Sequence, residues 1–322
     1  MSISAYIKDI GRGKDGARGL TREQATDLMG QVLDGTVTDL EVGAFCLAMR
    51  IKGETADEMA GFLDATHARI PPVPTTHAAT PTVVLPSYNG ARRLPLLTPL
   101  LAALLAREGL GVLLHGCETE DKRISTQKVL LALSSQQQFA IGYAKPVTPG
   151  VVTFWPTGQL HAGLQRLLDV RRVVGLRNPG HSLVKLMQPA VGPTVLVSSY
   201  THPEYLQSMT ATLSLTGTRA LLLRGTEGEA VADARRTPAM DAFEHGSVTR
   251  VQPAQEGPLT QLPDLPGPDA DSTAAWITAV LVGHVPVPTP IALQVQHTVR
   301  LARAAGTAHA TDLSHPTTAS TP

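Results

Sequence analysis

From residue 82 onward, short apolar runs alternate with longer segments in which apolar residues recur at helical spacing. Parallel neighbouring strands need a long crossover connection, which is most often a helix. The alternation therefore predicts an α/β domain with a central, mainly parallel sheet. The expected strands cover residues 82–85, 111–114, 140–143, 151–154, 194–198, 220–223 and 248–251. The expected helices cover residues 96–107, 124–133, 158–168, 203–215, 272–282 and 290–305.

The N-terminal segment has the pattern of short, capped helices. Three times, a threonine is followed three residues later by glutamate or glutamine, and then by apolar residues at helical spacing. In such a capping box the hydroxyl accepts a bond from a free backbone N–H, and the longer side chain reaches back to the cap residue. Gly35 and Gly53 lie where helix C-caps are expected. The three pairs are Thr21 with Gln24, Thr38 with Glu41, and Thr55 with Glu58.

A linker separates these helices from the rest of the chain. Residues 71–81, PPVPTTHAATP, are rich in proline and threonine and show no periodicity. We therefore expect an N-terminal helical subdomain over residues 1–72 and a larger α/β domain over residues 73–306. Residues 307–322 are small and polar, and we expect a disordered tail there. Short helices must bury their apolar stripes, against one another and against a second subunit.

Composition excludes several classes of protein. Hydrophobic residues make up 43% of the chain and charged residues 17%, which is typical of a packed core and not of a disordered chain. No apolar run reaches the roughly 18 residues of a membrane-spanning helix. The two cysteines, Cys46 and Cys117, make neither a disulfide framework nor a zinc site, and we expect no metal and no cofactor. The opening segment lacks the apolar core of a signal peptide, which predicts a cytoplasmic protein.

Charge is unevenly distributed along the chain. The totals are 27 basic and 27 acidic side chains, but residues 86–185 hold 12 basic and 5 acidic ones, a net charge of +7. Local charge sets the field that an anion meets, so this block predicts an anion-binding face. The alternative is that folding scatters these side chains over the whole surface. The candidate phosphate contacts are Arg92, Arg93, Lys122, Arg123, Lys128, Arg171, Arg172, Arg177 and Lys185.

The first two candidates follow a glycine-containing turn. Arg92 and Arg93 precede Pro95, which is a plausible first-turn residue of a helix. Cations in a first turn oppose the helix dipole, so phosphate contact explains them better than stability does. A solvated pair is the alternative.

The other candidates have ordinary structural explanations as well. Acidic residues 118, 120 and 121 could pair with Lys122, Arg123 and Lys128. Arg171 and Arg172 are expected just after a helix, where favourable interaction with the helix C-terminus explains cations. The sequence NPGHS, residues 178–182, predicts a loop between the last two candidates.

Four segments together resemble a known family. They are LPSYNGARR at residues 85–93, LHGC at 114–117, DVRRVVGLRNPGHSLVKLMQP at 169–189 and LLLRGTEGEAVADARRTP at 221–238. Their order is similar to that of anthranilate phosphoribosyltransferase and its relatives in glycosyltransferase family 3, the class II nucleoside phosphorylase fold. In that family the first segment is a glycine loop around a sugar diphosphate, and the last ends in an Asp-Glu pair that binds magnesium. The resemblance implies an anthranilate phosphoribosyltransferase-like fold and a homodimer formed through the N-terminal helices.

The glycine loop departs from the family pattern. Consecutive glycines let backbone N–H groups converge on a phosphate without interference from Cβ atoms. Only Gly90 remains of them, beside Ser87 and Asn89. We expect these three residues and His115 to form a remnant anion pocket. For His115 the alternative is a hydrogen bond to a loop carbonyl.

The metal motif departs as well. No adjacent Asp-Glu pair remains, and Glu227 and Glu229 are expected in a solvated loop. Leu114 and Cys117 replace the family's lysine and asparagine around His-Gly. Because a departing diphosphate needs a metal to neutralise its charge, we do not expect phosphoribosyl transfer.

This altered set of motifs looks like that of the YbiB-type branch of the family, which implies nucleic-acid binding without sequence preference. We therefore expect non-catalytic binding of DNA, with RNA as a further candidate partner. Two alternatives stay open. One is a phosphoribosyltransferase or nucleoside phosphorylase with an altered substrate, and the other is a protein-interaction scaffold.

Overall fold

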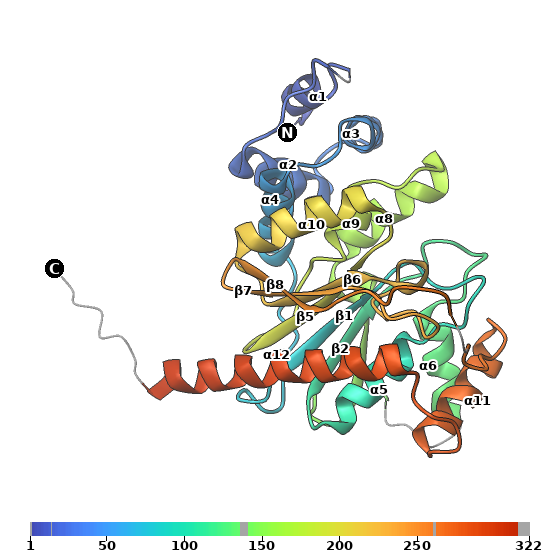
Figure 1. The fold of residues 1–322 in the computed structure, drawn as a ribbon. Coiled ribbons are helices and arrows are strands. Elements are labelled where there is room, and N and C mark those ends of the chain that lie inside the picture. Colours follow the sequence, from blue (N-terminus) through green and yellow to red (C-terminus); the bar gives the residue numbers. More distant parts are fainter. Residues whose placement is uncertain (1, 14, 136–140, 260–261, 315–322) are drawn as a thin grey trace.

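The computed structural model describes residues 2–13, 15–135, 141–259 and 262–314. Over these residues the chain forms a layered α/β domain with a small helical bundle stacked on one side of it (Figure 1). The predicted fold class is thereby confirmed. In the described part of the chain, no helix has the length and hydropathy needed to span a membrane.

The sheet has eight strands over the described residues, in the order β3-β4-β2-β1-β5-β6-β7-β8. Strands β1 to β6 pair in parallel, and β7 and β8 add an antiparallel edge. The predicted strands are confirmed over their described residues. The bounds are β1 Thr82–Ser87, β2 Gly111–Gly116, β3 Ile141–Tyr143, β4 Val152–Pro156, β5 Thr194–Tyr200, β6 Ala220–Arg224, β7 Met240–Glu244 and β8 Ser247–Gln252.

Strand β7 was not predicted from the sequence. It is short and carries Asp241 between apolar residues, so its pattern does not resemble a buried run. It pairs with β8 through a two-residue turn in which His245 and Gly246 have φ values of 50° and 81°. Such left-handed pairs match the twist of a hairpin.

Alternate residues of the central strands enter two different cores. Val83 and Leu85 pack with α5, α6, α11 and α12 on one face of the sheet, and Val84 packs on the other face with α8, α9, α10 and the N-terminal helices. Figure 1 shows α12 lying along the sheet and projecting beyond it. The bounds are α5 Thr98–Arg107, α6 Thr126–Ser135, α7 Thr157–Leu160, α8 Ala162–Val174, α9 Gly180–Leu183, α10 Pro203–Thr216, α11 Ala270–Leu281 and α12 Thr289–Ser314.

The N-terminal bundle confirms all three predicted capping boxes. In each of α2, α3 and α4, the threonine oxygen accepts from the third backbone N–H, and the glutamate or glutamine side chain accepts from the cap residue. Gly35 adopts the left-handed conformation (φ 69°) that favours glycine at a C-cap. Helix α1 was not predicted, because it is short and has no side-chain cap. The bounds are α1 Ser4–Ile10, α2 Arg22–Asp34, α3 Asp39–Lys52 and α4 Ala56–His67.

Four local predictions differ from the structure, and the first is the single helix expected over residues 158–168, which is divided into α7 and α8 at the extended residue His161. Helix α5 begins only at Thr98, with a different proline in its first turn, so Arg92 and Arg93 precede the helix and do not face its dipole. The segment NPGHS is not simply a loop, because α9 begins within it. Helix α12 continues to Ser314, so the expected tail at residues 307–322 begins inside a helix. Residues 315–322 lie outside the described residues.

Candidate functional site

The candidate site lies at the carboxyl edge of the parallel strands, where open α/β sheets commonly bind ligands. The loop after β1 pairs with the loop after β2 through the backbone of Ala91 and Ile124, with N–H···O distances of 2.9 and 2.8 Å. Gly90 has a φ of 65°, and a Cβ there would lie 2.7 Å from the Ile124 carbonyl oxygen. Glycine is therefore required where these two loops meet.

The predicted remnant anion pocket is filled by the chain itself. One carboxylate oxygen of Glu229 accepts from the backbone N–H groups of Asn89 and Gly90, at 2.8 and 2.7 Å. The other accepts from the hydroxyls of Ser87 and Thr98, at 2.5 and 3.2 Å. Glu229 is 1% exposed, so the prediction that it lies in a solvated loop is wrong. A buried carboxylate needs such donors, and here it occupies the place that a small anion would take.

A second carboxylate occupies the next turn of the same loop. Glu227 accepts from the backbone N–H groups of residues 92, 93 and 94, at 3.0, 2.7 and 3.0 Å. The guanidinium of Arg123 also donates to it, at 3.2 Å, and donates to the Gly90 carbonyl at 3.1 Å. The loop after β1 therefore directs its backbone donors at two internal carboxylates.

These residues do not fit a magnesium-bound diphosphate. That ligand needs free N–H donors for its phosphates and free carboxylate oxygens for the metal. The oxygens of Glu227 and Glu229 are bonded to those same N–H donors. In the described ranges, no group of three or more His, Cys, Asp or Glu side chains is arranged to hold a metal ion.

The buried histidine of the predicted pocket is closed off as well. The Nδ1 atom of His115 lies 2.7 Å from the hydroxyl of Tyr88, and Thr157 donates to that same hydroxyl at 3.0 Å. His115 is fully buried, and burial lowers its pKa to about 3, although the backbone of Met187 opposes this shift. The imidazole is therefore a neutral group of the interior, packed beside Tyr88.

Most of the predicted cations meet beside the closed loop. Glu120 accepts from both Arg123 and Arg171, at 3.1 and 3.0 Å, which joins the second loop to the last turn of α8. Arg172 pairs with Asp121, whose pKa is lowered because the guanidinium donates to its carboxylate. The candidates from three distant segments thus share one edge of the sheet.

Ion pairs neutralise part of this charge. Lys128 is 2.7 Å from Glu118, so the pairing considered for this stretch is present for Lys128 and Arg123. By contrast, Arg92, Arg93 and Lys122 are exposed, and their side chains form no ion pair in the described part of the chain. These three cations are free to meet an external anion.

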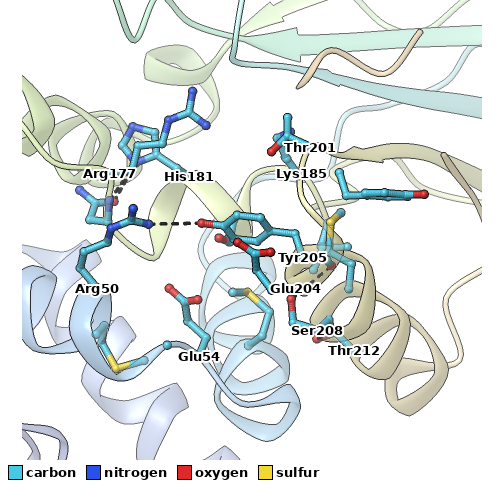
Figure 2. A pocket seen from close by; sticks show the side chains of 18 of the residues that line it. Arg50, Glu54, Arg177, His181, Lys185, Thr201, Glu204, Tyr205, Ser208 and Thr212 are labelled. Carbon is cyan, nitrogen blue, oxygen red and sulfur yellow. Dashed lines mark hydrogen bonds between the residues drawn. The ribbon is translucent and has the colours of Figure 1, made fainter. Parts of the chain in front are cut away.

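Two predicted cations face a different place. Arg177 and Lys185 line a cavity of about 280 Å³ between the N-terminal bundle and the α/β domain, as Figure 2 shows. The Lys185 ammonium donates to the carbonyls of Ser199 and Gly228 at 3.2 and 2.8 Å, and burial lowers its pKa to about 8. These two side chains therefore line the cavity, but they are not remote from the edge, since burial and the nearby charges of Arg171 and Arg123 lower the pKa of Arg177.

Both cationic and acidic side chains line the cavity. His181 lies beside Arg177, and burial together with that guanidinium lowers the histidine's pKa to about 3. From α3, Arg50 donates to the Tyr205 hydroxyl at 3.2 Å, and Glu54 lines the cavity from the loop before α4 (Figure 2). Burial raises the pKa of Glu54.

Comparison with known proteins identifies the family. The uncharacterized protein YbiB of Escherichia coli (strain K12) is 36% identical over 304 residues, covering 92% of this chain and 92% of YbiB. The anthranilate phosphoribosyltransferase of Methylorubrum populi is 30% identical over 278 residues, covering 82% of this chain and 79% of that enzyme. The chain belongs to the anthranilate phosphoribosyltransferase-like family. Residues 4–69 match the helical bundle domain of the glycosyl transferase family.

Solved structures of this family share the fold. Anthranilate phosphoribosyltransferase from Thermus thermophilus has a TM-score of 0.63 at 21% identity, covering 96% of this chain and 90% of that one. The enzyme from Saccharomyces cerevisiae, solved in complex with PRPP and Mg, has a TM-score of 0.65 at 14% identity, covering 95% and 89%. At these identities the likeness concerns the fold alone.

Sequence reasoning missed the two glutamates as site residues. The sequence predicts them only in a solvated loop, as part of a metal motif without its adjacent Asp-Glu pair. Two changes taken together could have indicated them. The loop after β1 lacks the glycines that would bind phosphate, and acidic residues lie on a second loop that the same fold places beside it. Their separation from the first loop, 140 residues for Glu229 and Asn89, hides the contact in the sequence.

Proposed function

We propose that this protein binds nucleic acids without catalysis and without reading bases, with DNA as the principal partner and RNA as a second one. The observation that supports this most is the state of the loop after β1. Its inner donors are satisfied by Glu227 and Glu229, while Arg92 and Arg93 on its outer side are exposed and unpaired in the described structure. A site whose donors are not available to a small diphosphate, but which has unpaired cations around it, favours the binding of a polyanion.

The interface we propose is centred on Arg92, Arg93 and Lys122. The paired cations Arg123, Lys128, Arg171 and Arg172 lie beside them and can exchange a carboxylate partner for a phosphate. Phosphate contacts of this kind carry no sequence information, so binding is expected to be similar for different sequences. A protein with this role would act in the cytoplasm.

Fluorescence anisotropy with labelled, mixed-sequence duplexes tests the proposal. The variant Arg92→Ala/Arg93→Ala/Lys122→Ala should bind about tenfold more weakly or worse, because it removes three cations that neutralise phosphates. The matched control Lys8→Ala/Arg107→Ala/Arg300→Ala removes three exposed cations elsewhere and should bind like the wild type. Equal affinity of both variants, or no binding by the wild type, would refute the interface.

The alternative, an enzyme with an altered substrate, gives a different result. Phosphoribosyl pyrophosphate or phosphate with magnesium would then raise the Tm of the wild-type protein, because ligands that bind the folded state stabilise it by mass action. With the donors of the loop after β1 occupied by two internal carboxylates, we expect no such shift. A clear shift at millimolar ligand would favour the enzyme and count against the proposal.

We also propose that the protein is a homodimer formed through its N-terminal helices. Leu40, Leu47 and Ile51 are exposed by 84%, 45% and 60%, and their spacing places them on one side of α3. A shallow hollow between α1 and α3 includes Ile7 and the last two of them. A second copy would cover this stripe with an identical one, as twofold symmetry requires.

Size-exclusion chromatography coupled to light scattering measures the oligomeric state directly. We expect a dimer for the wild type and a folded monomer for Leu47→Lys/Ile51→Lys, because two charges would be buried at the contact. A wild-type monomer, or a dimer that survives both substitutions, would show that this face is not the interface.

A further inference from the structure

The Glu227 carboxylate lies where an external anion could lie. Three consecutive backbone N–H groups, those of residues 92–94, converge on it at 2.7 to 3.0 Å, and Arg123 adds a fourth donor at 3.2 Å. Consecutive N–H groups of this kind form a concave nest for anions. The same donors suit the oxygens of a phosphate, which accepts several charge-assisted bonds at once.

Glu227 is held less firmly than its neighbour Glu229. The Glu227 side chain is 15% exposed, whereas Glu229 is 1% exposed and inside the domain. Glu227 also has a φ of 51°, a left-handed conformation that costs free energy in a residue with a side chain. Glu227 can therefore leave its nest without opening the core, and the carboxylate of Glu229 cannot.

We propose that the nest of residues 92–94, together with Arg123, is a binding site for a phosphate group, and that Glu227 is a built-in competitor which the phosphate displaces. The proposal rests on the proposed function for the source of that phosphate, the backbone of a nucleic acid. A phosphodiester carries one negative charge, as a carboxylate does, so it can replace the Glu227 side chain at the same donors. Arg92 and Arg93 are placed to contact the neighbouring phosphates.

Glu227→Gly opens the nest. It removes the carboxylate and places at this φ the residue that adopts it without strain, so the fold should be kept. The matched control is Asp121→Ala, which removes one negative charge from the same edge and one of the two carboxylate partners of Arg172 without touching the nest. We expect Glu227→Gly to bind duplex DNA about tenfold more tightly than the wild type, and Asp121→Ala only about twofold, because only the first frees backbone donors.

Inorganic phosphate gives a second measurement that needs no nucleic acid. Millimolar phosphate should raise the Tm of Glu227→Gly above that seen with sodium chloride of equal ionic strength, and should not do so for the wild type or Asp121→Ala. Should Glu227→Gly fail to fold, Glu227→Gln keeps the side-chain shape without the charge and is expected to shift both readouts in the same direction by a smaller amount.

The outcomes separate this proposal from the proposed function. If wild-type protein binds DNA but Glu227→Gly binds no more tightly than Asp121→Ala and does not respond to phosphate, the nest is not the site, and the proposed function is unaffected. If no form binds nucleic acid while phosphate still stabilises Glu227→Gly, the proposed function fails and the phosphate nest holds.

Discussion

Two glutamates, two residues apart, decide what the loop after β1 can bind. Glu229 is enclosed and has four donors from residues on β1, its loop and α5. Glu227 sits nearer the surface and uses the outer N–H groups. The two glutamates therefore have different roles because they differ in burial, although their side chains are chemically the same.

That difference predicts unequal losses of stability. Glu229→Ala leaves two backbone N–H groups buried without an acceptor, and we expect it to lower the free energy of unfolding by about 3 kcal/mol. Glu227→Ala leaves N–H groups that water can reach, and we expect a decrease of less than about 1 kcal/mol. Urea denaturation of both variants measures this, and equal decreases would contradict the difference in burial between the two carboxylates.

His115 predicts a dependence of stability on pH. Burial lowers its pKa from the ordinary 6.5 to about 3, so between these values the unfolded chain binds a proton that the folded site does not. This contribution to stability is complete above pH 6.5 and is lost as the pH falls toward 3, by about 1.4 kcal/mol per pH unit.

Urea denaturation between pH 7 and pH 4.5 compares the wild type with His115→Gln. The variant cannot take up that proton, so its free energy of unfolding should fall less steeply with decreasing pH. Parallel slopes for the two proteins would show that His115 is accessible to protons in the folded state.

At the scale of helices and strands, the sequence was a good guide wherever the signal was local. Capping boxes span four residues and strands span about five, so the residues that stabilise each element are neighbours in the chain. The proline that opens α5 was misplaced, because Pro95 and Pro99 both suit a helix start and only packing decides between them. Strand β7 was missed because its contacts with β6, not its own pattern, keep it in the sheet.

The capping boxes differ in how deeply they are buried, so we expect substitutions in them to lower the free energy of unfolding by different amounts. Glu58 is fully buried and accepts from the backbone N–H groups of Leu20 and Thr55 and from the Lys52 ammonium. Gln24 has the same position in its own box but is exposed. We expect Glu58→Ala to cost about 3 kcal/mol, because it leaves the nearly buried Lys52 ammonium with only the Gly53 carbonyl and leaves a buried N–H without an acceptor.

Gln24→Ala is the matched control and should cost about 0.5 to 1 kcal/mol, the usual value of a cap at the surface. Thermal and urea unfolding of the two variants give the comparison. Similar costs for both would show that the buried box contributes no more than an ordinary cap.

At the scale of the whole molecule, one edge of the sheet combines a closed anion loop with free cations. The excess of basic residues between positions 86 and 185 indicated this edge, because parallel strands place the loops that follow them at the same edge of the sheet. What the sequence did not reveal is which cations stay free. Arg92 and Arg123 look alike in a charge count, but the pairing of Arg123, Arg171 and Arg172 with acids depends on contacts across up to 104 residues.

The salt dependence of DNA affinity tests the proposed interface most directly. Each phosphate that the protein neutralises releases counterions, so the logarithm of the binding constant should fall linearly with the logarithm of salt concentration, by about 0.9 per neutralised phosphate. For Arg92→Ala/Arg93→Ala/Lys122→Ala we predict a slope that is shallower by about 0.9 for each phosphate that the variant no longer neutralises. An affinity that does not change with salt, or an identical slope for wild type and variant, would contradict binding through these three cations.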